Sequence, residues 1–287
     1  MDQTMNRSSP QSQPFTAGSR RDSDRSLSLA YEGSPSHPSF NEKLFSLKQG
    51  PTFREGFFKH ILVLFICFIP FLHANTTSNE QKRQIEDLKK HVCDALPFDG
   101  WCSKQKAGCL IDLVMEVNPA VYVEIGVYAG RSLFPVASAL KFLGKGVIIG
   151  IDPWDKEEMI KYFDTPEYAA ISIWWSNINY ENIYYSYLNM LKKFELEEYC
   201  ITMKTTSKQA ASEVIYPIDI LYIDGNPSET CSTQDVLLYL PLVRPGGYIY
   251  LNDILWPTKQ RAAELLLQSC EIVRRFDNGN CVLFKKR

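Results

Sequence analysis

The sequence predicts an α/β protein built on a doubly wound, mostly parallel sheet of seven strands that ends in an antiparallel β-hairpin. Short apolar runs rich in Val and Ile recur along the C-terminal two-thirds of the chain, as expected for strands buried on both faces. Stretches with helical spacing separate these runs, which indicates parallel strands joined by crossover helices. The last two runs flank an Asn-Gly pair, a pattern typical of a hairpin turn.

The predicted elements follow one another in a regular order. The expected parallel strands are 121–125, 146–151, 200–204, 218–223 and 248–252. The expected helices are 132–142, 178–194, 207–214, 233–240 and 259–269. Two further strands, 271–276 and 281–285, enclose the Asn-Gly pair and should make the last strand antiparallel.

The region before the first strand divides into three parts. Residues 1–55 are rich in Ser, Pro, Gln and Arg and lack periodicity, so we expect a disordered tail. Residues 56–75 contain an apolar run that predicts a hydrophobic helix. Residues 76–118 combine helix-favouring charged residues with apolar residues at helical spacing, and they predict a helical preface to the main domain.

Three interpretations of the hydrophobic segment stay open. The apolar run 61–72 would make a helix of roughly 18 Å, shorter than the ~30 Å hydrocarbon core of a bilayer. Counting from Phe57 to Ala74 gives a segment that could span with snorkelling ends. The segment is a membrane-associated or signal-anchor helix, a cleaved export signal behind an overlong start, or a helix packed on the main domain.

Charge and cysteine usage exclude several kinds of protein. The formal net charge is only −2, so no surface that neutralises many phosphates is expected, and no nucleic-acid partner is predicted. The eight cysteines include no C-x-x-C pair and no zinc-ligand spacing. They favour structural or free thiols over a metal or redox site.

The segment after the first predicted strand has the composition of a ligand-binding turn, at the end of a sheet where ligands of open α/β folds bind. It contains Glu124, Gly126, Tyr128, Gly130 and Ser132. The glycines permit a tight turn, and a helix N-terminus with unpaired N–H groups follows. A nicotinamide-binding fingerprint would need glycine at position 128, so Tyr128 disfavours hydride-transfer enzymes.

Asp152 directly follows the second predicted strand and precedes Pro153. A carboxylate at this place can accept hydrogen bonds from both ribose hydroxyls of an adenosine. Taken alone, an acid before proline is equally an ordinary turn residue. Together with the preceding glycine turn, Asp152 predicts a ribose site.

Three motifs follow in order between Asp219 and Asp253. The fourth strand reads Asp-Ile-Leu-Tyr-Ile-Asp-Gly, a Leu-Pro-Leu-Val-Arg-Pro-Gly-Gly stretch leads into the fifth, and Asn252-Asp253 follows it. With the first turn and Asp152, this ordered set resembles the class I S-adenosylmethionine-dependent methyltransferases, particularly the small-molecule and sugar O-methyltransferases of the methyltransferase-24-like group. The resemblance covers about residues 105–287 and implies a Rossmann-like methyltransferase domain over 119–287.

The resemblance also implies roles for individual residues. The methionine and ribose side of an S-adenosyl-L-methionine site would be lined by Glu124, Gly126, Tyr128, Gly130 and Ser132. Asp152 would hold the ribose, Trp154 would flank the adenine, and Ser207 would lie nearby after the third strand.

A Mg²⁺ site is implied as well, with departures from the family pattern. In metal-dependent members an acid after strand four and an Asp-Asn pair after strand five bind the ion, and here Asp224, Asn252 and Asp253 stand there with the pair reversed. The stretch after strand four also has Asn226-Pro227 in place of the usual Asp-His. Asp224 and Asp253 are the candidate catalytic bases, or alternatively they orient the cofactor amine and cap the strands.

Aromatic residues are dense between the second and third predicted strands. They are Tyr162, Phe163, Tyr168, Trp174, Trp175, Tyr180, Tyr184, Tyr185 and Tyr187. They predict either an apolar lid or pocket for an acceptor, or ordinary packing of helices on the sheet.

The sequence therefore predicts an O-methyltransferase for a small-molecule or sugar-containing acceptor. Its catalytic domain is expected in the cytoplasm, with membrane association through residues 57–74 if that segment stays attached. A second hypothesis is a catalytically degraded cofactor-binding domain that serves as a membrane-tethered interaction module.

Overall fold

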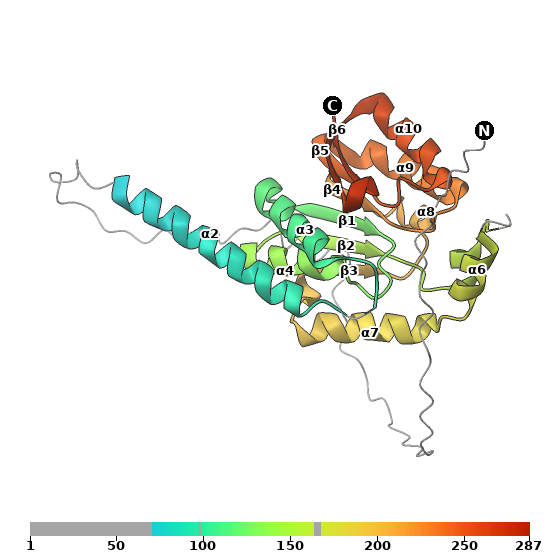
Figure 1. Ribbon diagram of the computed structural model, residues 1–287, viewed down its shortest axis with the longest axis horizontal. Helices are drawn as coiled ribbons and strands as arrows, with labels where there is room; N and C mark the ends of the chain where they lie inside the picture. The colour runs from blue at the N-terminus through green and yellow to red at the C-terminus, as the bar shows by residue number, and fades with distance from the viewer. Residues whose placement is uncertain (1–70, 98, 164–167) are drawn as a thin grey trace, which may run out of the picture. The chain divides into compact units, whose positions relative to one another are not determined.

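The computed structural model describes residues 71–97, 99–163 and 168–287, in which the strands form one sheet in the order β3-β2-β1-β4-β5-β7-β6 (Figure 1). The predicted tail 1–55 and most of the predicted hydrophobic helix 56–75 lie outside these residues. Within the described ranges, no helix combines the length and the apolar character needed to cross a membrane.

The parallel strands lie where the apolar runs predicted them. The first four are β1 (Val121–Ile125), β2 (Val147–Ile151), β3 (Cys200–Met203) and β4 (Ile218–Ile223), with β1 between β2 and β4. β5 (Val243–Leu251) pairs with β4 but begins at Val243, earlier than the predicted residue 248. Its first half contains a Pro-Gly-Gly sequence, which disfavours regular strand, and the pairing with β4 shifts register there.

The chain ends in the predicted hairpin. β6 (Cys270–Phe276) pairs antiparallel with β7 (Cys281–Lys286), and β7 also pairs antiparallel with β5. The connection is the short turn η5 (Asp277–Gly279), in which all three residues have positive φ. Asn and Gly tolerate this backbone better than other residues, which is why their pair marked the turn in the sequence.

Helices cover both faces of the sheet, as a doubly wound fold requires (Figure 1). One face carries α2 (Phe71–Asp94), α3 (Lys104–Val117), α4 (Leu133–Leu143) and α7 (Tyr180–Lys193). The other carries α8 (Ser207–Ala210), α9 (Glu229–Tyr239) and α10 (Gln260–Ser269). Each face of the sheet has its own hydrophobic core. Successive side chains of β1 point into the two cores in turn, since Tyr122 packs on the first face and Val123 on the second.

Two helices differ from their predicted extent. The helix predicted over 207–214 is only α8, and the chain after Ala210 continues as a turn. Ala210 and Val214 are both buried, so the spacing that predicted four more helical residues is produced by one helical turn and a bend. α9 begins before the predicted residue 233, because the Ser228 hydroxyl caps it by accepting the N–H of Cys231 at 3.3 Å.

Two helices occupy the predicted preface, and α3 leads from it toward the sheet. Ser103 caps α3 by accepting the N–H of Lys106 at 3.1 Å, and Asn118 ends it in a left-handed conformation. Lys89 of α2 forms an ion pair with Asp112 of α3 at 2.9 Å. Between β2 and β3 two shorter helices, α5 (Lys156–Ile160) and α6 (Ala169–Ser176), precede α7.

Candidate cofactor and acceptor site

Gly126 lies where the carboxyl ends of β1, β2 and β4 meet. Its N–H donates to the carbonyl oxygen of Ile151 at 2.9 Å, and its φ is +87°. A Cβ at this position would lie 2.2 Å from the carbonyl oxygen of Asp224. Glycine is therefore required to bring the turn after β1 against the end of β4.

Asp152 ties the turn after β1 to the end of β2. Its Oδ2 accepts the N–H of Tyr128 at 2.9 Å, and its Oδ1 accepts the N–H of Trp154 at 2.7 Å. The residue is only 4% exposed, and burial raises the pKa of Asp152 while the backbone donors lower it. With backbone N–H groups of Val127, Tyr128 and Trp154 acting on it, the carboxylate still has acceptor capacity for a hydroxyl.

The two residues that donate to Asp152 have unusual backbones. Tyr128 has φ +51° and Trp154 has φ +45°, both in the left-handed region that large side chains rarely adopt. The Trp154 indole N–H also donates to the carbonyl oxygen of Tyr128, at 2.7 Å. Such strain is retained where the surroundings fix the backbone, and it concentrates at binding and catalytic sites.

Glu124 is fully buried at the end of β1. Its Oε1 accepts the hydroxyl of Ser132 at 2.6 Å, whereas its Oε2 has no hydrogen-bond partner. Burial raises the pKa of Glu124 to about 8, although the Ser132 hydrogen bond lowers it. Burial thus favours the protonated form of the Glu124 carboxyl, and a cationic ligand group nearby would favour its ionisation.

Gly130 lets the same turn pack closely on α7. Its φ is +80°, and a Cβ there would lie 2.7 Å from Cε of Met190 and 2.8 Å from the ring of Tyr187. The turn is thus held between α7 and the sheet.

A cavity of about 710 Å³ opens at the strand ends beside α5, α8 and α9. Three predicted cofactor residues, Gly126, Asp152 and Ser207, line it, together with Gly225 and Asp235. The volume lies in the range of about 300–1,000 Å³ typical of small-molecule pockets. The predicted ribose acid therefore borders a space large enough for a ligand.

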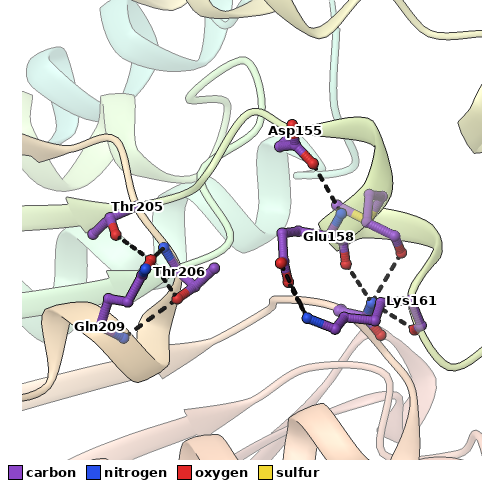
Figure 2. Close-up of polar contacts among 8 residues, drawn as sticks. Asp155, Glu158, Lys161, Thr205, Thr206 and Gln209 are labelled. Atoms are coloured by element: carbon purple, nitrogen blue, oxygen red, sulfur yellow. Dashed lines mark hydrogen bonds and ion pairs between the residues drawn. The ribbon is translucent and has the colours of Figure 1, made fainter.

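Figure 2 shows polar residues on two sides of this cavity. On one side, Thr206 caps α8 through a reciprocal capping box with Gln209. On the other, Lys161 follows α5 and forms an ion pair with Glu158 at 3.0 Å. The cavity thus presents hydroxyl, amide and charged groups together.

Asn226, where the family pattern has an acid, holds the end of α5 in place. Its Nδ2 donates to the carbonyl oxygens of Glu158, Met159 and Lys161 at 3.0, 2.9 and 3.1 Å. Its Oδ1 accepts the N–H of Ser228 at 2.9 Å. A carboxylate cannot donate, so this contact requires the amide.

Ser207, which is half-buried, and Asp235, which is buried, form a pair in the cavity wall. The Ser207 hydroxyl donates to Oδ1 of Asp235, and the Ser207 carbonyl oxygen accepts the hydroxyl of Tyr239 at 2.7 Å. Burial raises the pKa of Asp235 to about 6. The sequence singled out Ser207 but missed Asp235, which lies within α9 and away from any strand end.

The three predicted metal ligands lie at the ends of β4 and β5 but point in different directions. Asn252 donates through Nδ2 to Oδ1 of Asp224 at 2.8 Å, and its Oδ1 accepts Nζ of Lys106 at 2.7 Å. Asp253 has φ +57°, and its Oδ1 accepts Nδ2 of Asn280 at 2.8 Å.

This arrangement does not fit a divalent cation. The oxygen of Asn252 faces an ammonium group, and Asp253 is bonded to the hairpin connection rather than to Asp224. Across the described part of the chain, no three His, Cys, Asp or Glu residues gather closely enough to hold a metal ion. Burial raises the pKa of Asp224, while the charge of Lys106 lowers it.

A second lysine, Lys259, is buried near the same carboxylates. It ends η4 (Pro257–Lys259), is 1% exposed, and its Nζ has no hydrogen-bond partner. Burial lowers the pKa of Lys259, whereas the charges of Asp224 and Asp235 raise it. Sequence reasoning missed both lysines, because nothing in their local pattern distinguishes them from solvent-exposed helix residues.

The aromatic segment serves two purposes. Tyr187 is fully buried, and its hydroxyl shares a hydrogen bond with Thr202 at 2.8 Å, so it packs α7 on the sheet. Trp154 stacks on the Tyr187 ring at 5.3 Å and is not among the residues that line the cavity. We predicted that Trp154 flanks the adenine. The position of the Trp154 ring in this structure does not favour that role, which stays a prediction.

A second group of aromatic rings, partly exposed to solvent, lies beside the turn after β1. Trp101 lies 5.3 Å from Tyr128, 5.5 Å from Trp174 and 5.4 Å from Trp175, measured between ring centroids. Trp101 is 62% exposed and Trp174 49% exposed. We call these four residues the aromatic cluster; Trp101 was not singled out from the sequence because it precedes the sheet.

Comparison with known proteins gives a family match and one curated relative. Residues 123–254 match the family model described as a methyltransferase domain. An uncharacterized protein of Acanthamoeba polyphaga mimivirus is 29% identical over 141 residues, which are 48% of this chain and 53% of that protein. The chain therefore spans about half the length of this relative.

Solved structures with similar architecture include two O-methyltransferases. One, from Bacillus cereus and in complex with SAH, has a TM-score of 0.46 and 14% identity, over 71% of this chain and 90% of that one. The other, TomG from Streptomyces achromogenes in complex with SAM, has a TM-score of 0.49 and 15% identity, over 70% of this chain and 88% of that one.

Proposed function

We propose that this chain is a class I S-adenosylmethionine-dependent methyltransferase, as the match of residues 123–254 to a methyltransferase domain supports, and that it transfers a methyl group to an oxygen atom of a small molecule. The observation that carries the proposal is the cavity at the strand ends, where Gly126, Asp152 and Ser207 come together. These residues come from three different strand-to-helix connections.

The chemistry of the cavity supports an adenosyl ligand. Asp152 keeps acceptor capacity beyond the backbone N–H groups that it accepts, as contact with a ribose requires. Ser207 and Asp235 border the same space and offer hydrogen-bonding groups to an adenine. Buried Glu124, which precedes the glycine turn in sequence and does not line the cavity, has an unsatisfied oxygen that suits the cationic methionine part.

Bound S-adenosylmethionine supplies an electrophilic sulfonium methyl group. The chain has to align the acceptor oxygen in line with the carbon–sulfur bond, exclude water and accept the hydroxyl proton. The carbon–oxygen bond would form as the methyl carbon–sulfur bond breaks, S-adenosylhomocysteine would leave, and the hydroxyl proton would pass to a carboxylate. Asp224 is the first candidate, because burial raises its pKa and makes it a stronger base than an exposed carboxylate; Asp253 is the second.

The aromatic cluster supports a ring-bearing or otherwise apolar acceptor. One of its members is Tyr128, whose backbone forms part of the turn that would carry the cofactor, and the Trp101 and Trp175 rings contact the Tyr128 ring. Exposed rings in several orientations offer both faces and edges to a flat ligand. A sugar-containing acceptor would use the same faces for apolar contact.

Isothermal titration with S-adenosylhomocysteine, followed by a methyl-release assay over a panel of phenols and sugar derivatives, tests the proposal. Binding together with turnover supports it. Binding without turnover on any acceptor would favour the second hypothesis, an interaction module that retains only the cofactor. The departure at Asn226 no longer argues for that hypothesis, since its amide supports the cavity wall. NAD should not bind.

Membrane association through residues 57–74 also stays a prediction, because nearly all of that segment lies outside the described residues. We expect the methyltransferase domain on the cytosolic side, where S-adenosylmethionine is available. Alkaline carbonate extraction of the full chain from cell membranes tests this, and release into the supernatant would contradict an anchored segment.

A further inference from the structure

The ammonium group of Lys106 lies at the ends of β4 and β5, where the family resemblance implied a metal ion. Lys106 comes from α3, outside the residues matched by the family model. It is 4% exposed, and its Nζ donates to Oδ1 of Asn252 at 2.7 Å. The ring of Tyr222 lies 5.2 Å from Nζ, which adds a cation–π contact.

The orientation of Asn252 follows from this contact. An ammonium group only donates hydrogen bonds, so the amide oxygen must face Lys106 and the amide nitrogen must face away. That nitrogen donates to Oδ1 of Asp224 at 2.8 Å, while Oδ2 of Asp224 accepts the hydroxyl of Tyr222 at 3.1 Å. The amide oxygen that a metal would need is therefore already bonded to Lys106.

Two buried lysines lie near the carboxylates at this end of the sheet. Lys106 and Lys259 are both buried, and Lys259 interacts electrostatically with Asp224, Asp235 and Asp253. The Lys106 ammonium group, bonded to Asn252 beside Asp224, would repel a divalent cation strongly, since charges interact more strongly where water is excluded.

We propose that Lys106 is a built-in cation that replaces Mg²⁺ in this chain. It is a positioning residue: through Asn252 it orients Asp224 toward the acceptor, and its charge excludes a divalent ion. Resting on the proposed function, this narrows the acceptor class. Chelation of two vicinal hydroxyls is not needed, so the acceptor is bound by ring contacts and hydrogen bonds and presents a single reactive hydroxyl.

Electron paramagnetic resonance of Mn²⁺ in the presence of the full chain measures metal binding. It tests, independently of activity, whether Lys106 replaces Mg²⁺. Lys106→Met removes the charge and keeps the stem, Lys106→Arg keeps a cation, and Lys104→Met removes an exposed lysine of the same helix as a matched control. We expect Mn²⁺ to bind weakly to the wild type, Lys106→Arg and Lys104→Met. Lys106→Met should bind Mn²⁺ at least about tenfold more tightly, a difference of about 1.4 kcal/mol.

Two results would overturn the proposal. One is saturable Mn²⁺ binding by the wild type that Asp224→Asn abolishes; the other is a folded Lys106→Met protein that binds no more Mn²⁺ than the wild type. Lys106→Gln serves in its place if Lys106→Met does not fold. Titration of the same samples with S-adenosylhomocysteine distinguishes the two proposals. If the wild type does not bind S-adenosylhomocysteine, the proposed function is wrong, but the Mn²⁺ result still tests the role of Lys106.

Discussion

The N–H of Tyr128 donates to Oδ2 of Asp152 at 2.9 Å, so the turn after β1 is bonded directly to the acid at the end of β2. The acid that would hold the ribose and the turn that would hold the methionine part therefore form one rigid unit. A site held in place before the ligand arrives loses less entropy on binding.

Gly126→Ala should abolish cofactor binding and destabilise the domain. The new Cβ would lie 2.2 Å from the Asp224 carbonyl oxygen, so the carboxyl ends of β1 and β4 would have to separate. The positive φ of this residue adds backbone strain for any residue other than glycine. We expect affinity for S-adenosylhomocysteine to fall by at least about 100-fold, or about 2.7 kcal/mol, in calorimetry.

The matched control is Gly144→Ala. Gly144 also has a positive φ, but a Cβ there would meet nothing within 4 Å. It should reduce stability by only about 1 kcal/mol and leave affinity unchanged. Equal loss of affinity in both variants would mean that backbone strain alone, rather than the contact between strand ends, is responsible.

Asp152→Asn should weaken cofactor binding by about 100-fold. The amide nitrogen would face a backbone N–H donor, either that of Tyr128 or that of Trp154, and one ribose contact would lose its charge. Asp155→Asn is the control, since Asp155 also accepts a backbone N–H, from Glu158 at 3.0 Å, but at an exposed helix cap. Calorimetry with adenosine and 2′-deoxyadenosine adds a second readout: the wild type should prefer adenosine, and a retained preference in Asp152→Asn would contradict the ribose contact.

The wild-type protein should lose stability as the pH rises toward alkaline values, and Glu124→Gln should make this loss smaller. The pKa of Glu124 is about 8 in the folded protein against an ordinary value of 4.5, so the folded state binds more protons between these values. Its contribution to stability is therefore complete below about pH 4.5 and is lost as the pH rises through about 8.

Urea unfolding at pH 6 and pH 9 measures this effect. The stability of Glu124→Gln relative to the wild type should increase between the two pH values by about 2–3 kcal/mol. Exposed Glu213→Gln provides the baseline. A constant difference across this range would show that Glu124 is already ionised in the folded protein.

Asn226→Asp should destabilise the cavity wall even though it restores the acid of the family pattern. Three carbonyl oxygens at the end of α5 would lose their donor and face a carboxylate, with an expected cost of about 2–3 kcal/mol in unfolding free energy. Asn177→Asp, at an exposed site with one amide donor bond, should cost less than about 1 kcal/mol. If Asn226→Asp is as stable as the wild type, the amide is not what holds α5.

The sequence predicted which residues lie at the strand ends of the candidate site, because that placement depends on local pattern. Short apolar runs mark buried strands, and the residues after them must lie together at one edge of a parallel sheet, which is how Gly126, Asp152 and Asp224 were identified. The start of β5 was misplaced because its Pro-Gly-Gly sequence disfavours strand, while pairing with β4 holds the backbone extended.

The remaining features depend on contacts between distant segments. Lys106 meets Asn252 across 146 positions of sequence, and a lysine within an amphipathic helix is ordinarily exposed. The ring of Trp154 turns toward Tyr187 because the backbone of Trp154 adopts a positive φ, which no local pattern reveals.

A crystal structure of the full chain with S-adenosylhomocysteine tests the central claim most directly. We expect the adenosyl group across the ends of β1 and β2, with both ribose hydroxyls within hydrogen-bond distance of the Asp152 carboxylate and the adenine beside Ser207. A ligand bound elsewhere, or a ribose that makes no contact with Asp152, would contradict the account.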